Sequence, residues 1–370
     1  MSVRPQVGTL LLADISGFTA FLARSDLEHA HDILLELLQL VVARLQPHLT
    51  IAEIEGDAVF AYAPAGAFPR GETLLDLIDQ TYGVFLGRVE AIRVHTTCDC
   101  TACNAIPILD LKFIVHQGEY ILQAVAGPAK PLGSEVNLAH RLLKNHVAES
   151  TGWKAYASLT EAAVLHLGIA SSGMHASVET YPELGPVRTF SYDLRERWQA
   201  SRRAQQILIG EKDADLEVKA DLPAPPAIVW DWLNDPKRRS QWVGLVVDRI
   251  SSPDERTGVG SKTHCTHGAK VESVHTILDW RPFEYFTEEI ARPSDGQPQA
   301  LNTITLEPIE GGTRVCSRYR VLVRPRLIAV PVFKRISASG IRASLDTLQR
   351  LLARGGPSAG ADADAVNGPA

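Results

Sequence analysis

An acidic residue closes the first apolar run of this 370-residue chain, and it constrains the start of the fold more than any other feature. Residues 8–18, GTLLLADISGF, are typical of a buried strand that ends at Asp14. Ser16 and Gly17 follow and turn the chain. The sequence therefore predicts a strand with a carboxylate at its end, followed by a helix.

The order of the next elements predicts an α+β domain over residues 5–195. Apolar residues at helical spacing indicate a helix between Ser25 and Pro47, and Glu55-Gly56-Asp57 is typical of a tight turn. The expected elements are strands at 49–54 and 58–63, a helix at about 72–92, a strand pair at 109–127, a helix at 136–148 and strands ending near 194. This order is that of a ferredoxin-like α+β fold.

A second domain is expected over residues 213–355, after a charged linker helix at 196–212. Its pattern is an initial strand, a helix or helix pair that starts at a proline, several strands and a closing amphipathic helix at 336–355. The tail at 356–370 is small and polar, so we expect it to be disordered.

Charge and hydropathy exclude two classes of partner. The net charge is −6, and the 37 Lys and Arg residues are scattered, which argues against nucleic acid. The N-terminus resembles neither a signal peptide nor an anchor, and no apolar run approaches the roughly 20 residues of a membrane-spanning helix. We expect a cytoplasmic protein without a membrane span.

Three segments together resemble the class III nucleotide cyclases: ADISGFT at 13–19, EGDA at 55–58 and GSEVNLAHRL at 133–142. In that family two aspartates hold two Mg²⁺ or Mn²⁺ ions on a nucleoside triphosphate, and hard carboxylate oxygens suit such ions. The resemblance assigns these roles to Asp14 and Asp57, with the carbonyl of Ile15 beside Asp14.

The resemblance also implies phosphate-binding groups. Backbone amides of Ser16, Gly17, Phe18 and Thr19, where a helix begins, are placed to hold phosphate oxygens. Residues 111–119 resemble the family strand that ends in a His-x-Gly turn, where Lys112 replaces the usual arginine. Lysine keeps the charge but lacks the bidentate fork of arginine, so its hold on phosphate is expected to differ.

Asn137 and Arg141 are the expected catalytic pair. Residues four apart share a helix face, so both side chains point together. The resemblance implies that Asn137 orients the ribose and that Arg141 stabilises charge on the α-phosphoryl group as pyrophosphate leaves. The family divides these two residues and the two aspartates between the sides of an interface, so one copy per chain implies a homodimer with composite sites.

The base-selecting positions depart from the adenine-specific pattern. Glu53 and Lys130 stand where adenine-specific members have lysine and aspartate or threonine. Glu53 can accept from guanine and Lys130 can donate to its O6, and cytosine also fits. Alternatively, the two side chains pair with each other and close the pocket. We hypothesise a substrate other than ATP.

Cysteines crowd one segment of the N-terminal half. Cys98, Cys100 and Cys103 lie within six residues, and His95 stands close enough to be a fourth ligand of a structural Zn²⁺. The alternatives are a redox-responsive thiol group and ordinary loop cysteines.

Residues 213–355 resemble the helix-grip superfamily of START-related and polyketide cyclase/dehydrase-like proteins (SRPBCC). That fold implies a small hydrophobic ligand in an apolar cavity. Aromatic residues either line it or form the core, namely Trp230, Trp232, Trp242 and Trp280. No catalytic set is evident here, and we interpret four residues as ordinary strand or cavity-lining positions: His264, Cys265, His267 and His275.

The leading hypothesis is a cyclase regulated by a hydrophobic ligand of the C-terminal domain. One alternative is a non-catalytic nucleotide and lipid sensor built on a degenerate cyclase dimer. Another makes the helix-grip domain the principal actor, as a carrier or small-molecule enzyme, with the N-terminal half serving as a dimeriser.

Overall fold

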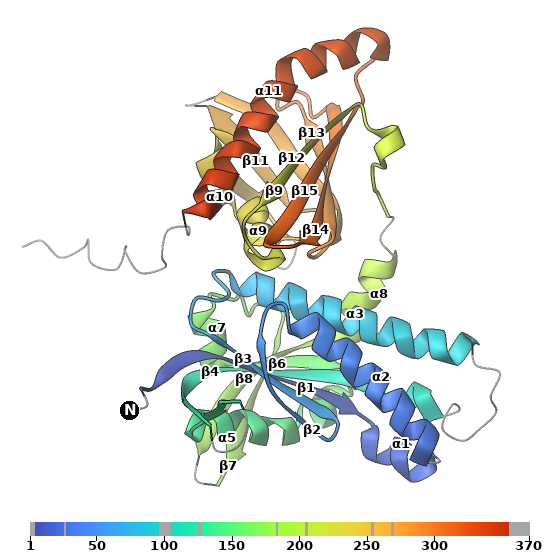
Figure 1. Ribbon diagram of the computed structural model, residues 1–370, viewed down its shortest axis with the longest axis vertical. Coiled ribbons are helices and arrows are strands. Elements are labelled where there is room, and N and C mark those ends of the chain that lie inside the picture. The colour runs from blue at the N-terminus through green and yellow to red at the C-terminus, as the bar shows by residue number, and fades with distance from the viewer. Residues whose placement is uncertain are drawn as a thin grey trace, which may run out of the picture. The chain divides into compact units, whose positions relative to one another are not determined.

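The computed structural model describes residues 4–25, 27–95, 105–124, 128–182, 184–203, 206–252, 255–267 and 270–354. The chain divides into two compact units, Met1–Arg203 and Ala204–Ala370, and each is described by itself. Both units combine helices with a sheet, so the expected α+β class is confirmed (Figure 1).

The first strand of the N-terminal unit lies inside its sheet, with a neighbouring strand on each side. Strand β1 (Gln6–Ser16) is flanked by β3 (Ala58–Pro64) and β4 (Asp110–Gln123), both antiparallel to it. Within the described residues the strand order is β2-β3-β1-β4-β6-β8-β7, with β5 paired to β4. The other strands are β2 (Thr50–Glu55), β5 (Lys130–Leu132), β6 (Tyr156–Thr160), β7 (His175–Tyr181) and β8 (Gly185–Asp193).

Apolar side chains of β1 point to both faces of the sheet, and helices cover them. Leu10 and Leu12 pack with Val136 and Ala139 of α5 (Ser134–Arg141) in one core cluster. Helices α2 (Leu27–Leu45) and α3 (Gly71–His95) lie side by side (Figure 1). The remaining helices are α1 (Phe18–Arg24), α6 (Val147–Thr151), α7 (Glu161–His166) and α8 (Leu194–Arg203).

The expected strand pair at 109–127 is wrong, because β4 is one continuous strand from Asp110 to Gln123. Gly118 therefore makes no His-x-Gly turn. A Cβ at Gly118 would lie 2.5 Å from the Cβ of Glu135, which belongs to α5. The glycine allows the helix to approach the strand closely, and a glycine in a strand often marks such an approach.

The expected helix at 136–148 is also wrong in part, because it divides into two. Helix α5 ends at Arg141, a 3₁₀ turn covers Leu142–Lys144, and α6 begins at Val147. Asn145 explains the break: its Nδ2 donates to the Leu142 carbonyl at 2.7 Å, and its Oδ1 accepts from the Val147 amide at 2.9 Å. Side-chain bonds of this kind compete with the helical ladder.

The C-terminal unit is a helix-grip fold, as the resemblance implies. In its described part the strand order is β10-β11-β12-β13-β14-β15-β9. A long helix, α11 (Arg326–Ala353), packs against β9 and β15 (Figure 1). The strands are β9 (Leu216–Leu222), β10 (Val246–Ser251), β11 (Lys262–His267), β12 (Lys270–Arg281), β13 (Tyr285–Ala291), β14 (Pro298–Ile309) and β15 (Gly312–Val321), and the other helices are α9 (Pro226–Asn234) and α10 (Pro236–Val243).

Helix α11 begins ten residues before the expected start at 336. Pro331 lies inside it, near the N-terminal end. Proline removes the amide that would bond to the carbonyl of Leu327, and Leu327 is 91% exposed, so water can satisfy that carbonyl. The sequence pattern placed the helix start too late because proline usually marks a helix boundary.

The tryptophans of α9 and α10 belong to the core of the C-terminal unit. Trp230 is fully buried, and its ring centroid lies 4.7 Å from that of Trp280 and 5.7 Å from that of Phe286. Trp242 is also buried and donates its Nε1–H to the carbonyl of Trp232 at 3.0 Å. Across the described ranges no helix is long and apolar enough to cross a membrane.

Candidate active site

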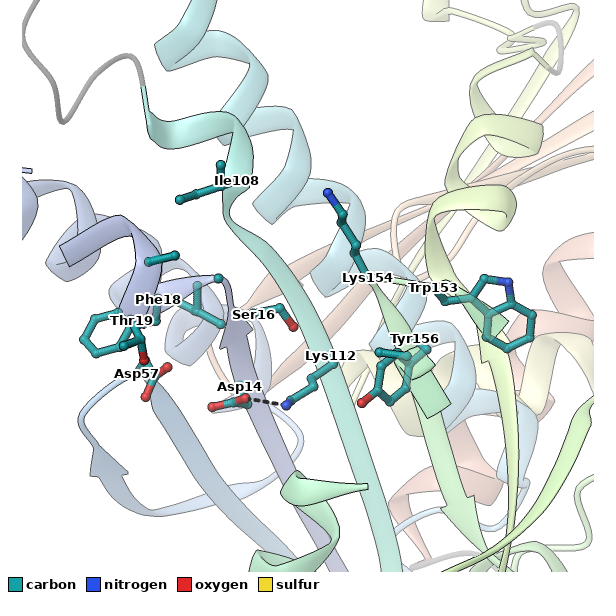
Figure 2. A pocket seen from close by; sticks show the side chains of 15 residues that line it. Asp14, Ser16, Phe18, Thr19, Asp57, Ile108, Lys112, Trp153, Lys154 and Tyr156 are labelled. Atoms are coloured by element: carbon teal, nitrogen blue, oxygen red, sulfur yellow. Dashed lines mark ion pairs between the residues drawn. The ribbon is translucent and has the colours of Figure 1, made fainter. Parts of the chain in front are cut away.

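A pocket of about 760 Å³ opens at the end of β1 in the N-terminal unit (Figure 2). Side chains and backbone from β1, α1, the β2–β3 hairpin, β4 and the α6–β6 connection line it. They belong to Asp14, Ile15, Ser16, Gly17, Phe18, Thr19, Ala20, Asp57, Ile108, Lys112, Ala148, Gly152, Trp153, Lys154 and Tyr156.

Asp14 and Asp57 meet here although 43 positions separate them. Asp14 is paired in register with Ala58, the neighbour of Asp57, and the Ile15 amide donates to the Asp57 carbonyl at 3.1 Å. The tight turn expected at residues 55–57 is present, with Gly56 at φ 63°. Cross-strand pairing therefore fixes both carboxylates at the same edge of the pocket.

The two carboxylates, of Asp14 and Asp57, repel each other. Partial burial of Asp57 raises the pKa of its carboxyl above the usual range, and the negative charge of Asp14 raises it further. A divalent cation between the two aspartates would relieve this repulsion, and oxygen donors suit Mg²⁺ and Mn²⁺. The residues present therefore fit the metal role that the resemblance gives them.

Lys112 lies on β4 directly opposite Asp14. Its Nζ is 3.0 Å from Oδ2 of Asp14 and donates to the Leu143 carbonyl, also at 3.0 Å (Figure 2). The ammonium group thus neutralises one of the two carboxylates that line the pocket.

The N-terminal end of α1 forms one wall of the pocket, with Phe18 and Thr19 among the lining residues. Gly17 precedes the helix with φ 84°, in the left-handed region that favours glycine. A Cβ at this position would lie 2.4 Å from the carbonyl oxygen of Ile108. Conformation and close approach together require glycine here.

We expect Gly17→Ala to destabilise the N-terminal unit more than Gly66→Ala does. Gly66 has φ 85°, but a Cβ there would meet no atom within 4 Å, so it isolates the conformational penalty of about 1 kcal/mol. The contact with Ile108 adds about 1–3 kcal/mol of overpacking at Gly17. Urea unfolding of both variants measures the difference, and equal free energies of unfolding would contradict the close approach.

Asn137 and Arg141 lie on α5, and neither lines the pocket. Both side chains are exposed, whereas Val136 and Ala139 on the opposite face are buried. The structure therefore brings together the aspartates, Ile15, residues 17–19 and Lys112, but not the expected catalytic pair. This pair forms part of the exposed surface of α5.

A buried histidine holds α5 against the sheet. His116 of β4 is 3% exposed, and its Nε2 lies 2.7 Å from Oε2 of Glu135 in the first turn of α5. Its Nδ1 lies 2.8 Å from Oγ1 of Thr160. These contacts fix the helix that carries Asn137 and Arg141.

Glu53 and Lys130 form an ion pair, with 2.7 Å between Oε1 and Nζ. The bond and charge of Lys130 lower the pKa of Glu53. This is the mutual pairing that the sequence left open as an alternative to base recognition. Neither residue lines the pocket around the aspartates.

Sequence reasoning missed the wall formed by Trp153, Lys154 and Tyr156. Lys154 is exposed, and Tyr156 begins β6, which runs parallel to β4 (Figure 2). The only signal was Gly152, which ends α6 with φ 78°. That glycine predicts a turn, but no pattern in the sequence says that the turn faces Asp14.

The possible zinc ligands Cys98, Cys100 and Cys103 lie outside the described residues. His95 is the last residue of α3, and its side chain also lies outside them. The described side chains contain no group of three or more His, Cys, Asp or Glu that could hold a metal.

Two family comparisons divide the chain much as the structure does. Residues 34–151 match a family described as a protein of unknown function (DUF2652), and residues 213–353 match the polyketide cyclase/dehydrase and lipid transport family. The second match confirms the resemblance of the C-terminal unit. An uncharacterized protein of Mycobacterium tuberculosis is 36% identical over 102 residues, 28% of this chain. The match spans 47% of that relative, about half its length.

Solved structures similar to the N-terminal half include nucleotide cyclases, the family that the motifs resemble. The adenylyl cyclase CyaB from P. aeruginosa is 15% identical, with 52% of this chain and 95% of that chain covered and a TM-score of 0.39. The guanylyl cyclase Cya2 is also 15% identical, with 52% and 93% covered and a TM-score of 0.37.

Proposed function

We propose that the N-terminal unit is a metal-dependent nucleotidyl cyclase that converts a nucleoside triphosphate to a 3′,5′-cyclic nucleotide and pyrophosphate. One observation carries the proposal: Asp14 and Asp57, from two separate motifs, converge on one pocket beside the start of α1. A pocket with two carboxylates and backbone amides suits a triphosphate bound with divalent ions.

The residues of this chain divide the work by position. Asp14, Asp57 and the Ile15 carbonyl would hold Mg²⁺ or Mn²⁺, which when bound supplies positive charge and lowers the pKa of the attacking 3′-hydroxyl. The amides of Gly17, Phe18 and Thr19 donate to phosphate oxygens. Lys112 and Lys154 also line the pocket and balance negative charge there.

The rest of the site comes from a second copy of the chain. Asn137 and Arg141 are exposed and lie away from the pocket of their own chain. A two-fold dimer that places α5 of one copy over the pocket of the other completes two equal sites. Arg141 of the partner subunit then stabilises charge that develops on the α-phosphoryl group.

Glu53 and Lys130 do not line the pocket of their own chain, so in the proposed dimer they would meet the base from the partner subunit, and guanine fits this pair best. When the ion pair between Glu53 and Lys130 opens, the carboxylate accepts from the guanine N1–H and amino group, and the ammonium donates to O6. Adenine presents a donor where Lys130 also donates. The proposed substrate is therefore GTP, with CTP as the second candidate.

The C-terminal unit is proposed to bind a hydrophobic ligand and so regulate the cyclase. Its match to a lipid transport family supports the ligand, and its fusion to the cyclase unit supports regulation. The alternative is a non-catalytic nucleotide and lipid sensor. One observation favours it: Lys112 forms an ion pair with Asp14, and the same carboxylate would have to bind the metal in a cyclase.

A turnover assay of the purified dimer tests the proposal, with ATP, GTP, CTP and UTP supplied separately in Mn²⁺ or Mg²⁺. The expected result is a cyclic product and pyrophosphate from GTP, with ATP converted at least tenfold more slowly because its base leaves polar groups unpaired. Efficient conversion of ATP alone would overturn the base assignment. Nucleotide binding without any product would favour the sensor.

A further inference from the structure

A row of exposed apolar side chains marks the first half of α11. Ile328, Val332 and Ile336 are 65%, 49% and 72% exposed, and the neighbouring Leu327 is even more exposed. A spacing of four residues places the first three along one side of the helix. These four side chains are called the apolar ridge below.

The apolar ridge differs from the rest of the surface. Elsewhere in the described ranges, any ten consecutive positions contain at most two exposed large apolar side chains, and such scattering is ordinary on protein surfaces. The ridge has four of them within positions 327–336. A concentration of this kind on a helix face indicates a contact surface.

The opposite side of the helix is fixed to the sheet. The ring centroid of Phe333 lies 5.7 Å from that of Tyr319 on β15, and Arg326 donates to both carboxylate oxygens of Asp215, at 2.7 Å and 2.8 Å. All residues of α11 are described, and none of its large apolar side chains after Ile336 is exposed. The ridge is therefore confined to the first half of a helix that is held in place.

The chain around the ridge contains cations and no acids. Residues 311–345 include eight Lys and Arg residues and no Asp or Glu, although the whole chain has a net charge of −6. Three of the eight pair with Asp215, Glu217 or Asp221, at or next to β9. Four others are exposed, form no ion pair with a described residue and are called the basic group below: Arg324, Lys334, Arg335 and Arg342.

The basic group and the apolar ridge share one region of the surface. Residues three or seven positions apart lie on the same side of a helix, so Arg335 stands beside Val332 and Ile328, and Lys334 stands beside Leu327. Long Lys and Arg side chains can lay their apolar stems along such a surface and extend their charged ends away from it. The first turns of α11 extend beyond the ends of the strands (Figure 1).

The chemistry of this surface favours a lipid bilayer over a protein partner. The centres of protein interfaces are enriched in aromatic residues and depleted in Lys, whereas the ridge consists of Leu, Ile and Val between cations. An anionic bilayer offers apolar acyl chains to the aliphatic groups and negative head groups to the cations. Both halves of the surface then find a partner at once.

We propose that the first half of α11 is a docking site for the surface of an anionic membrane. The apolar ridge enters the boundary between head groups and acyl chains, and the basic group contacts the negative head groups. The contact is peripheral, with the helix lying along the bilayer surface. The inference goes beyond the proposed cyclase and ligand-binding functions and depends on neither.

Co-sedimentation of the full chain with lipid vesicles tests the site. Vesicles of phosphatidylcholine alone are compared with vesicles that contain about 30% phosphatidylserine, an anionic lipid. We expect partitioning into the anionic vesicles to be at least about tenfold stronger, since each cation near such a surface adds roughly fivefold. The difference should shrink as NaCl is added, because salt screens exposed charges.

Two substitutions remove the centre of the apolar ridge. Ile328→Ser combined with Val332→Ser is expected to weaken binding to the anionic vesicles by about tenfold or more, because two aliphatic side chains no longer leave water. The matched control is Leu165→Ser combined with Val178→Ser, which changes two exposed apolar residues of the N-terminal unit. That control should bind like the unmodified protein.

A second pair of substitutions tests the basic group. Lys334→Gln combined with Arg335→Gln is expected to lower the preference for anionic vesicles by about tenfold or more. Arg350→Gln combined with Arg354→Gln removes the same net charge from the other end of the helix region and should leave the preference unchanged. Thermal unfolding of every variant verifies the fold.

Several results would overturn the proposal. They are the absence of binding to anionic vesicles, equal binding to both kinds of vesicle, and normal binding by either pair of α11 variants. Sedimentation velocity without vesicles tests a second copy as the occupant: a smaller oligomer for Ile328→Ser with Val332→Ser would make the ridge an interface between copies. All of these readouts are independent of nucleotide turnover, so failure of the cyclase proposal is measured separately.

Discussion

Replacing Arg141 with alanine is expected to lower the turnover number for cyclic nucleotide formation by about 100- to 1,000-fold, the usual effect of removing one prepositioned donor from a developing anion. Arg141 is exposed on α5, so its loss leaves no buried group unpaired and creates no cavity. The affinity for the triphosphate should change little, because the donor acts mainly as charge develops. The measurement is kcat and KM with Mn²⁺ and the substrate that the turnover assay identifies.

Arg188→Ala is the control for this variant. Arg188 is an exposed arginine of β8 whose guanidinium pairs with Glu161 at 3.1 Å, and it does not line the pocket. We expect turnover within about twofold of the unmodified protein, because surface substitutions away from special features have small effects. Normal turnover of Arg141→Ala would remove this residue from the catalytic assignment, whatever the fate of the aspartates.

The strand, hairpin and helix that form the pocket could be predicted because local sequence determines them. Asp14 ends a short apolar run, and Gly56 permits the tight turn that presents Asp57. Both signals lie within a few residues of the feature they specify. The same holds for the α5 helix face that carries Asn137 and Arg141.

Features that depend on distant partners could not be predicted in this way. Gly118 looks like a turn residue, but its role is to admit Glu135 of a helix that follows later in the chain. Lys112 pairs with Asp14 because β1 and β4 are in that register, which no local pattern records. A one-residue shift in register would move every side chain of the strand to the other face.

The composite dimer makes the sharpest prediction, because two inactive proteins should restore each other. Asp57→Ala removes the metal side of each site, and Arg141→Ala removes the side that the partner subunit supplies. In a mixed dimer both substitutions fall in the same site, so the other site is intact. Random mixing of equal amounts makes half of the dimers mixed, which gives about a quarter of the unmodified activity.

The matched control combines two variants from the same side of the interface, Asp14→Ala and Asp57→Ala. Each site of their mixed dimer lacks one aspartate, so activity should stay at the level of the single variants. Differently tagged copies purified in tandem confirm that mixed dimers form. If the tagged mixture of Asp57→Ala and Arg141→Ala also stays inactive, the two residues act within one chain, and α5 must then move to the pocket of its own subunit.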